Sequence, residues 1–398
     1  MAAMSRKLLI AVVTVAFAAS YAAADEDLRR KTAISELDAG DGTWATVEQA
    51  MTRHGLQGLS VAVIDDYQVS WRRAWGVKSA GDKDAVETDT TFNIASIAKP
   101  VTATLIAMLA EKGFIDLDEP VATYLQRWQL PDNEFTRSAD ITLRHLLAHT
   151  SGATQHGYKD FYSGEEIPTL VDVLNGGDLP ATEKLDIDFE PGSRWRYSGG
   201  GYVIAQIAVE DHLEKPLAEL AAEFIFRPLE MTRTTMLRPD EDGFPENVAK
   251  AHDESGAVVA TGLPVCPQIS ASGLWTTPTD MARFLIEMQN ALRSSGSDVI
   301  SPAVAKLVTS EIMGGFGLGW ALFEPVGYME AFSHGGANTG TGGRVYATIE
   351  GGNGIVLFGN GPNSIREPVL AMLRESIVDA HGWRTPGVVE KSGTERPE

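Results

Sequence analysis

The chain has 398 residues, 43% of them hydrophobic, which is enough for one large domain or two closely packed ones with a full core. Its formal net charge of −21 repels phosphate backbones and anionic membranes, which argues against a nucleic-acid partner. The single cysteine, Cys266, has no second thiol in the chain, so the fold is expected to depend on packing, with Cys266 as a buried structural thiol.

The first 24 residues have the pattern of a secretory signal peptide. Arg6 and Lys7 form a basic start, an apolar run follows from Leu8 to Ala19, and alanines at 22–24 provide a small-residue cleavage site. The apolar run is too short to span a bilayer. We therefore expect an exported protein, periplasmic or secreted, without a stable membrane anchor.

The N-terminal part of the mature chain predicts one helix and a β-hairpin. Residues 25–42 are polar and form an expected exposed lead-in. A helix is predicted at 43–53, followed by strands at 59–64 and 69–75 that a short acidic turn would join.

Another helix is predicted to begin at about Ser96. Apolar residues recur at helical spacing, and Gly113 is a typical C-terminal stop. Pro100 is tolerated only in the first turn of a helix, which sets the start of this one.

The region 121–267 changes in character to helices and long loops, and the C-terminal part returns to strands. The helices predicted in the middle region span residues 141–149, 199–212 and 216–226. The later predictions are helices at 279–292 and 367–381, strands at 316–323, 343–350 and 354–360, and a polar tail at 383–398. The sequence GGNG at 351–354 predicts a hairpin between the last two strands.

Strands at both ends of the chain and helices in its middle predict an α+β fold. We expect one antiparallel sheet built from both chain ends (43–120 and 268–382), flanked by helices, with an inserted mainly α-helical region at 121–267. Pockets commonly form at such a junction. The helix that begins at Ser96 leaves the sheet there.

Ser96 and Lys99 lie three residues apart on the first turn of this helix, so their side chains share one face within hydrogen-bonding reach. A serine hydroxyl becomes a nucleophile when a base takes its proton. A lysine can be that base if burial lowers its pKa. The alternative is a plain N-cap serine beside a solvated lysine, and the pair is weak evidence alone.

Two later stretches offer partners. The loop from Arg194 to Tyr202 (RWRYSGGGY) precedes a helix and presents Tyr197 and Ser198, and a tyrosine hydroxyl there could shuttle protons. The alternative is a core tyrosine at a helix entrance.

The second stretch, residues 332–343 (FSHGGANTGTGG), carries His334, Gly335 and Gly336. Its glycines would let a substrate lie close to the backbone, and a main-chain N–H near Ala337 could form an oxyanion hole with that of Ser96. The alternative is a glycine-rich loop with a surface histidine.

These stretches together resemble the serine β-lactamase and penicillin-binding protein superfamily, most closely its class C β-lactamase and esterase branch. The first motif, Ser-x-x-Lys, is at 96–99, and the second, Tyr-x-Asn in class C enzymes, is Tyr-Ser-Gly at 197–199. The third, Lys-Thr-Gly or a histidine variant, is His-Gly-Gly at 334–336. The resemblance covers residues 43–382 in the correct order and implies a serine hydrolase domain.

The resemblance also implies a role for each motif residue. Ser96 would be the acylated nucleophile, and Lys99 and Tyr197 would share the acid–base work. His334 would orient Tyr197 or the substrate, and the backbone of Ser96 and Ala337 would hold the oxyanion. Further contacts to substrate are expected from Ser198, Gly335 and Gly336, and no metal or cofactor is implied.

Two departures from the class C pattern favour an ester or amide over a β-lactam, with a small ester first. Gly199 replaces an asparagine that contacts the amide side chain of a β-lactam, and His334 replaces a lysine that would pair with the substrate carboxylate. A class A mechanism is not expected, because residues 171–175 lack the glutamate that its deacylation loop needs. A β-lactamase, a D-Ala-directed peptidase and a penicillin- or peptidoglycan-binding module without turnover stay open as alternatives.

Other enzyme classes fit the sequence poorly. It contains no Gly-x-Ser-x-Gly nucleophile elbow and no Gly-x-x-x-x-Gly-Lys phosphate loop. His145 and His149 lie four residues apart but lack the glutamate of a zinc motif, so a core or capping role is expected for both.

Overall fold

The computed structural model describes residues 37–38, 44–179, 181–294 and 296–384. The predicted signal peptide, most of the predicted lead-in and nearly all of the polar tail lie outside the described residues. None of the described helices combines the length and the apolar character needed to cross a membrane.

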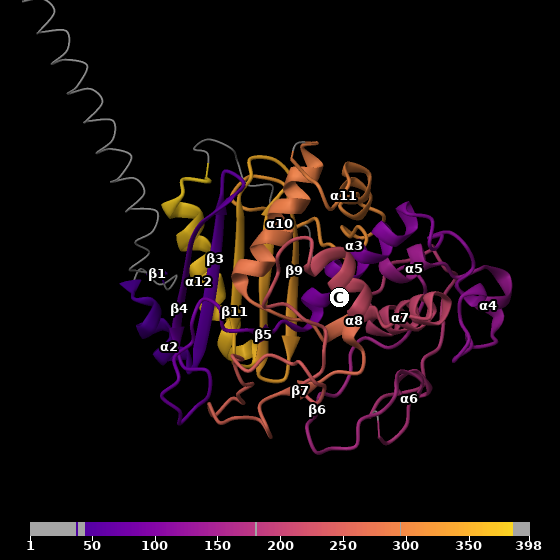
Figure 1. The fold of residues 1–398 in the computed structure, drawn as a ribbon, viewed down its shortest axis with the longest axis horizontal. Coiled ribbons are helices and arrows are strands. Elements are labelled where there is room, and N and C mark those ends of the chain that lie inside the picture. Colours follow the sequence, from indigo (N-terminus) through magenta and orange to yellow (C-terminus); the bar gives the residue numbers. More distant parts are fainter. Residues whose placement is uncertain (1–36, 39–43, 180, 295, 385–398) are drawn as a thin grey trace, which may run out of the picture.

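The centre of the molecule is a five-stranded antiparallel sheet built from two distant parts of the chain (Figure 1). The strand order is β4-β3-β11-β10-β9, and β3 pairs with β11 to join the N-terminal hairpin to the C-terminal strands. The strands are β3 (Gly58–Asp65), β4 (Gln68–Gly76), β9 (Ala331–Asn338), β10 (Thr341–Thr348) and β11 (Gly354–Gly359). The predicted α+β fold with an antiparallel sheet is confirmed.

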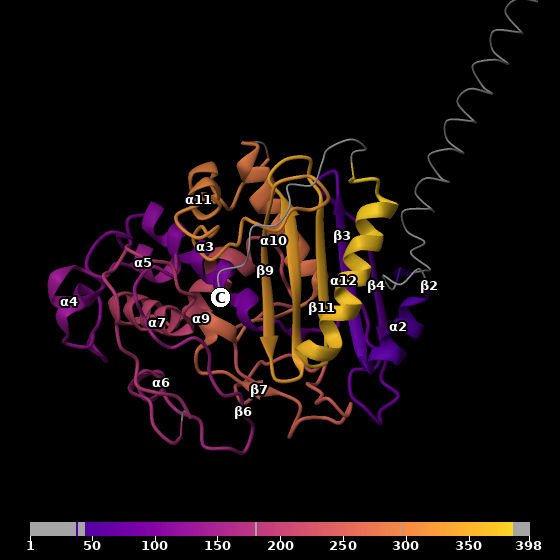
Figure 2. The same ribbon diagram turned by 180° about the vertical axis from the view of Figure 1, so that it is seen from behind.

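Helices cover both faces of this sheet. On one face α12 (Asn363–Ala380) packs with α2 (Val47–His54), and on the other lies α10 (Pro278–Leu292), as Figures 1 and 2 show. In β3, Val61 and Val63 join the hydrophobic core under α12, whereas Ala62 and Ile64 join the larger core under α10. This alternation is what a strand buried on both faces requires.

The second part of the molecule is mainly helical and has α7 (Gly199–Leu213) at its centre. Nearly every residue of α7 is buried, so this helix has no solvent-exposed face. The elements around it and along the junction with the sheet are α4 (Glu134–Ser138), α5 (Leu143–Leu147), α6 (Leu170–Asn175), α8 (Leu217–Ala221), the π-helical turn η3 (Ala222–Phe226), α9 (Ile269–Ser272) and α11 (Pro302–Val308). A short 3₁₀ turn, η2 (Val121–Thr123), leads into it.

Three short strand pairs complete the secondary structure of the described residues together with isolated bridges. The strands are β1 (Leu37–Asp38), β2 (Trp44–Ala45), β5 (Phe92–Asn93), β6 (Phe161–Tyr162), β7 (Pro264–Val265) and β8 (Trp275–Thr276). They pair as β1 with β2, β5 with β8 and β6 with β7. Strand β5 comes just before Ser96 in the chain, so its pairing with β8 fixes the backbone that leads into the first motif.

The predicted strand at 316–323 is wrong. This segment is a series of turns in which Leu318 N–H donates to Val308 O and Gly319 N–H donates to Leu147 O. Gly319 has a φ of +76°, which does not fit a continuous strand. The segment is apolar because it is buried between α11 and the helical region, and burial alone produced the strand-like pattern.

The alternative of a glycine-rich loop at 332–343 is also wrong, because residues 331–338 form the edge strand β9. Each residue of β9 is matched in register with one of β10, from Asn338 opposite Thr341 to Ala331 opposite Thr348. Pairing with β10 therefore overrides the low strand propensity of the glycines.

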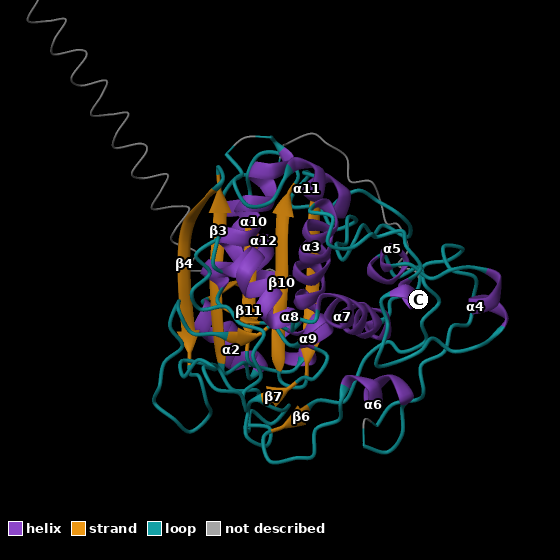
Figure 3. Cartoon of the chain, turned by 45° about the vertical axis from the view of Figure 1, so that its right-hand side comes forward, coloured by secondary structure: helices purple, strands orange, loops and turns teal. Residues whose placement is uncertain are grey.

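The helix predicted from Ser96 begins slightly later than expected. Residues Ala95–Ile97 form a 3₁₀ turn, η1, and the α-helix α3 spans Ala98–Glu111. Pro100 lies in the first turn of α3, as predicted. Figure 3 shows α3 beside the sheet with α7 beyond it, so the helix lies at the junction of the two parts.

Candidate active site

Ser96 and Lys99 are in contact at this junction. The Ser96 Oγ lies 3.1 Å from the Lys99 Nζ, and Lys99 is only 2% exposed. Burial lowers the pKa of Lys99 from 10.5 to about 7, because the charged ammonium loses its hydration. A substantial fraction of Lys99 is therefore neutral near pH 7 and able to accept the serine proton.

A backbone carbonyl holds the lysine in place. Lys99 Nζ donates to Ala271 O at 2.9 Å, and Thr102 Oγ1, one turn further along α3, donates to Ser270 O at 3.0 Å. Ser270 is itself tied to α7, since its hydroxyl donates to Tyr202 O. Sequence reasoning missed this support, because these backbone acceptors have no sequence signature.

Tyr197 lies beside the Ser96–Lys99 pair. The Lys99 Nζ lies 4.9 Å from the centre of the tyrosine ring, and the Tyr197 hydroxyl is close enough to the Ser96 side chain to affect its own pKa. Burial raises the pKa of Tyr197 above its usual value of 10, and the interaction with Ser96 offsets this only in part. Tyr197 is therefore a neutral phenol at pH 7, which suits a proton donor better than a base.

His149 fixes the backbone on both sides of Tyr197. Its carbonyl accepts from Arg196 N–H at 2.8 Å, its Nδ1 accepts from Ser198 N–H at 3.1 Å, and its ring packs 4.3 Å from the tyrosine ring. His149 adopts a φ of +60°, which lets one residue make all three contacts. Burial, followed by the nearby Lys99, holds the pKa of His149 well below 6.5, so the ring is neutral.

The sequence predicted a core or capping role for the two histidines at 145 and 149. His145 is the N3 residue of a capping box with Thr142 at the start of α5. His149 is buried, but sequence reasoning missed its contact with Tyr197. No set of three His, Cys, Asp or Glu side chains suited to a metal ion occurs in the described part of the chain.

Ser198 does not lie where the sequence placed it. It is the N-cap of α7, where its hydroxyl accepts from Gly201 N–H at 3.1 Å and donates to Gln155 O at 2.8 Å. It is buried and does not line the pocket described below. Because its donor and its acceptor are both used to hold the entrance of α7, the expected contact with substrate is corrected to a structural role.

The edge strand β9 passes directly beside Ser96. A Cβ atom placed on Gly336 would lie 2.0 Å from Ile94 O and 3.1 Å from Ser96 N, so only glycine allows this approach. Asn338 at the end of β9 also donates to Asn93 Oδ1 at 2.8 Å, which ties β9 to the strand that precedes η1.

The edge of β9 that does not pair with β10 faces the segment that carries Ser96. Ser333 N–H donates to Ala321 O and Ser333 O accepts from Ala321 N–H, on the side of β9 away from β10. Backbone groups alternate between the two edges of a strand, so Gly335 and Ala337 face this side as well. The N–H of Ala337 therefore lies on the side of β9 where Ser96 is, as an oxyanion hole requires.

His334 is neutral and buried against the site. Its Nδ1–H donates to Gly335 O at 2.6 Å, and its Nε2 has no hydrogen-bond partner among the described residues. Burial, with Lys99 nearby, lowers the pKa of His334 to about 3. The ring therefore offers an unprotonated Nε2 and no positive charge, and it lies 6.2 Å from the ring of Tyr197.

These groups open into a pocket of about 430 Å³. Its lining combines Ser96, Tyr197 and the β9 backbone with aromatic rings and with three charged side chains. The pocket is lined by Ser96, His156, Trp195, Tyr197, Phe316, Ala321, Phe323, Glu324, Ser333, His334, Gly335, Gly336, Ala337, Arg344, Asn363 and Glu367. All the site residues predicted from the sequence meet here except Ser198, with Lys99 directly behind Ser96.

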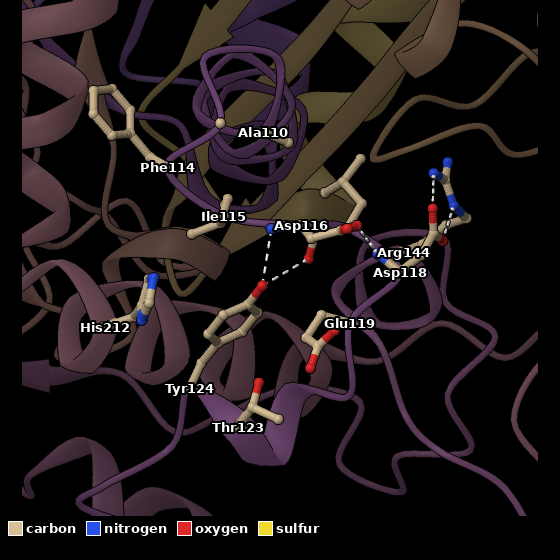
Figure 4. Close-up of a pocket in the computed structure, with 12 residues that line it drawn as sticks. Ala110, Phe114, Ile115, Asp116, Asp118, Glu119, Thr123, Tyr124, Arg144 and His212 are labelled. Carbon is tan, nitrogen blue, oxygen red and sulfur yellow. Dashed lines mark hydrogen bonds and ion pairs between the residues drawn. The ribbon is translucent and has the colours of Figure 1, made fainter.

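A larger pocket of about 720 Å³ lies near the end of α3 (Figure 4). Several of its polar groups are engaged within the protein, since Asp118 accepts two hydrogen bonds from Arg144 and the Tyr124 hydroxyl bonds the Asp116 backbone. Its described lining holds no serine, cysteine or lysine, so the smaller pocket, where Ser96 contacts Lys99, is the candidate active site.

Comparison with known proteins agrees with this assignment. Residues 45–377 match the Beta-lactamase family. The chain is 27% identical over 365 residues to Penicillin-binding protein 4 of Amycolatopsis lactamdurans, covering 87% of this chain and 91% of that protein.

Two further relatives are named as esterase or hydrolase. Esterase EstB of Burkholderia gladioli is 28% identical over 229 residues, covering 51% of this chain and 55% of the esterase. The structure titled "EstCE1, a hydrolase with promiscuous acyltransferase activity" superposes with a TM-score of 0.67 at 20% identity, covering 90% of this chain and 99% of that one. The chain therefore belongs to the β-lactamase family and is a serine hydrolase of that family's type.

Proposed function

We propose that this protein is an exported serine hydrolase that cleaves small carboxylic esters through an acyl-enzyme on Ser96. The observation that carries the proposal is the contact of Ser96 Oγ with the buried Lys99 Nζ, whose pKa of about 7 supplies a neutral base. Export is inferred from the signal-peptide pattern at residues 1–24.

In the proposed reaction, Lys99 accepts the proton of Ser96 while the serine oxygen attacks the ester carbonyl. The N–H groups of Ser96 and Ala337 stabilise the oxyanion of the tetrahedral intermediate. The neutral phenol of Tyr197 donates a proton to the leaving alkoxide, and the proton held by Lys99 then restores Tyr197. A water molecule releases the acyl group by the same steps in reverse.

Two features of the site favour an ester over a β-lactam. A Cβ atom on Gly199 would lie 2.9 Å from both His156 O and a ring carbon of Tyr158, so this position has little room for the asparagine of class C enzymes. His334 is neutral and cannot replace the lysine that would pair with a β-lactam carboxylate. The relationship to Esterase EstB supports the same choice.

A second candidate is a β-lactam- or D-peptide-directed activity. It is favoured by the relationship to Penicillin-binding protein 4 of Amycolatopsis lactamdurans, which extends over 91% of that protein. Turnover would distinguish a hydrolase from a module that is acylated without release.

The Ser96→Ala variant tests the nucleophile. We expect it to lose hydrolysis of a short-chain p-nitrophenyl ester by about a thousandfold or more, because the variant removes the hydroxyl that contacts Lys99 Nζ. Ser333→Ala, which changes another serine lining the pocket, serves as the matched control. Wild-type protein is expected to hydrolyse a chromogenic cephalosporin slowly, and rapid Ser96-dependent cephalosporin turnover would instead support the second candidate.

The pH dependence of kcat/KM tests the base. Only neutral Lys99 accepts a proton, so kcat/KM for the ester is expected to rise with pH, with an apparent pKa near 7. Tyr197 stays protonated over this range because its pKa is raised, so no fall is expected before alkaline pH. A profile that is flat or falls between about pH 6 and 8 would contradict the role of Lys99.

The His149→Phe variant tests how Tyr197 is held. Phenylalanine keeps the ring contact but leaves the buried Ser198 N–H without its acceptor, and we expect kcat to fall roughly 10- to 100-fold with little change in KM. His149→Gln, whose amide oxygen can accept that bond, is expected to recover part of kcat. His156→Phe is the control, since the His156 ring lies 5.1 Å from that of Tyr197 but makes no bond to its flanking backbone. A folded His149→Phe protein with wild-type kcat would show that His149 does not position Tyr197.

A further inference from the structure

One guanidinium lines the described part of the active-site pocket. Among the described residues that line this pocket, Arg344 is the only arginine or lysine. It lies on β10 directly opposite Gly335 on β9. A Cβ atom on Gly335 would lie 3.0 Å from the Arg344 guanidinium carbon, so the guanidinium packs against the backbone next to His334.

Two carboxylates form ion pairs with this guanidinium. Glu367, from the first turns of α12, accepts from Arg344 Nε at 2.9 Å, and Glu324, from the segment before β9, lies 3.6 Å from an Arg344 terminal nitrogen. Both glutamates line the pocket as well. The three side chains are between a quarter and a third exposed, so they are accessible to a substrate but only partly screened by water.

A second arginine lies behind this cluster. Arg366 is fully buried, and its terminal nitrogens donate to Gly361 O and Gly336 O. It lies 3.8 Å from Glu367 but does not line the pocket. It helps to hold Glu367 and the β9 backbone in place, and it is not available to a substrate.

The charged side chains among the described lining residues therefore offer no free cation. One guanidinium faces two carboxylates, and the neighbouring His334 is neutral. A substrate carboxylate beside Arg344 would also lie close to two negative groups, and like charges at close range are unfavourable. The lining also has an apolar part, with Trp195 and Phe316 stacked 4.8 Å apart and Phe323 5.6 Å from Phe316.

We propose that Glu324 and Glu367 determine the substrate class by keeping Arg344 occupied, so that the pocket accepts esters with uncharged apolar or aromatic groups and discriminates against esters that carry a carboxylate. This inference rests on the proposed esterase function. It assigns specificity to three residues outside the Ser96, Lys99 and Tyr197 machinery.

A pair of substrates that differ by one charge tests the proposal. Methyl 3-acetoxybenzoate and 3-acetoxybenzoate have the same acetyl ester, but only the second carries a carboxylate on its leaving group. A second pair, p-nitrophenyl pentanoate and p-nitrophenyl hemisuccinate, tests a charge on the acyl group, because only the hemisuccinate carries a carboxylate there. The measured quantity is the ratio of kcat/KM for the neutral member to that for the anionic member.

We expect wild-type protein to favour the neutral member of at least one pair by about tenfold or more at low salt, and this ratio to fall as salt is added. Glu324→Gln together with Glu367→Gln should lower the ratio about tenfold by freeing Arg344. Arg344→Gln should raise it, because both carboxylates then remain without their cation. The control is Glu375→Gln, which removes one negative charge from α12, as Glu367→Gln does, at a residue that does not line the pocket.

Two results would overturn the proposal. One is a wild-type ratio near one for both pairs, and the other is a double variant whose ratios match those of Glu375→Gln. If the double variant does not fold, the opposite shift expected of Arg344→Gln still decides the matter, and an unchanged or lowered ratio there would overturn it. Ser96→Ala separates this inference from the proposed function, since hydrolysis that survives Ser96→Ala refutes the esterase mechanism itself.

Discussion

The site depends on the burial of one lysine against one serine. Lys99 points from the first turn of α3 into a space where its ammonium loses hydration, and the resulting pKa of about 7 turns it into a base. The Ala271 carbonyl directs the lysine nitrogen, so its position depends on α9 and, through Ser270, on α7. The helical region therefore helps to determine the position of Lys99, although this residue belongs to the sheet side of the junction.

The remaining groups come from different parts of the fold. β9 brings the Ala337 N–H and His334 from the sheet, while the entrance of α7 brings Tyr197 from the helical region. Gly336 allows β9 to pass against the backbone of η1, and His149 fixes the backbone on both sides of Tyr197. Each contact is between residues far apart in sequence, so the site exists only when the two parts are packed together.

This origin explains what the sequence could predict. The contact of Ser96 with Lys99 is local to one helical turn, so spacing alone predicted it. Glycine-rich sequence marked the stretches of Tyr197 and His334 as candidates, but only the resemblance to a family favoured a site role over a structural one for each. His149 was missed as a site residue. It contacts the Tyr197 segment through its carbonyl, a ring nitrogen and its ring face, and such tertiary contacts leave no pattern in a linear sequence. The same limit produced the wrong strand at 316–323, where tertiary burial resembled strand periodicity.

The central claim is an acyl-enzyme on Ser96 formed with Lys99 as the base. The most direct test is mass spectrometry of intact protein quenched in acid during turnover of a p-nitrophenyl ester, followed by mapping of the modified peptide. The account predicts one acyl group on Ser96 in the wild-type protein, none in Ser96→Ala, and much slower labelling in Lys99→Met. Turnover without an adduct, or an acyl group on another residue, would contradict it.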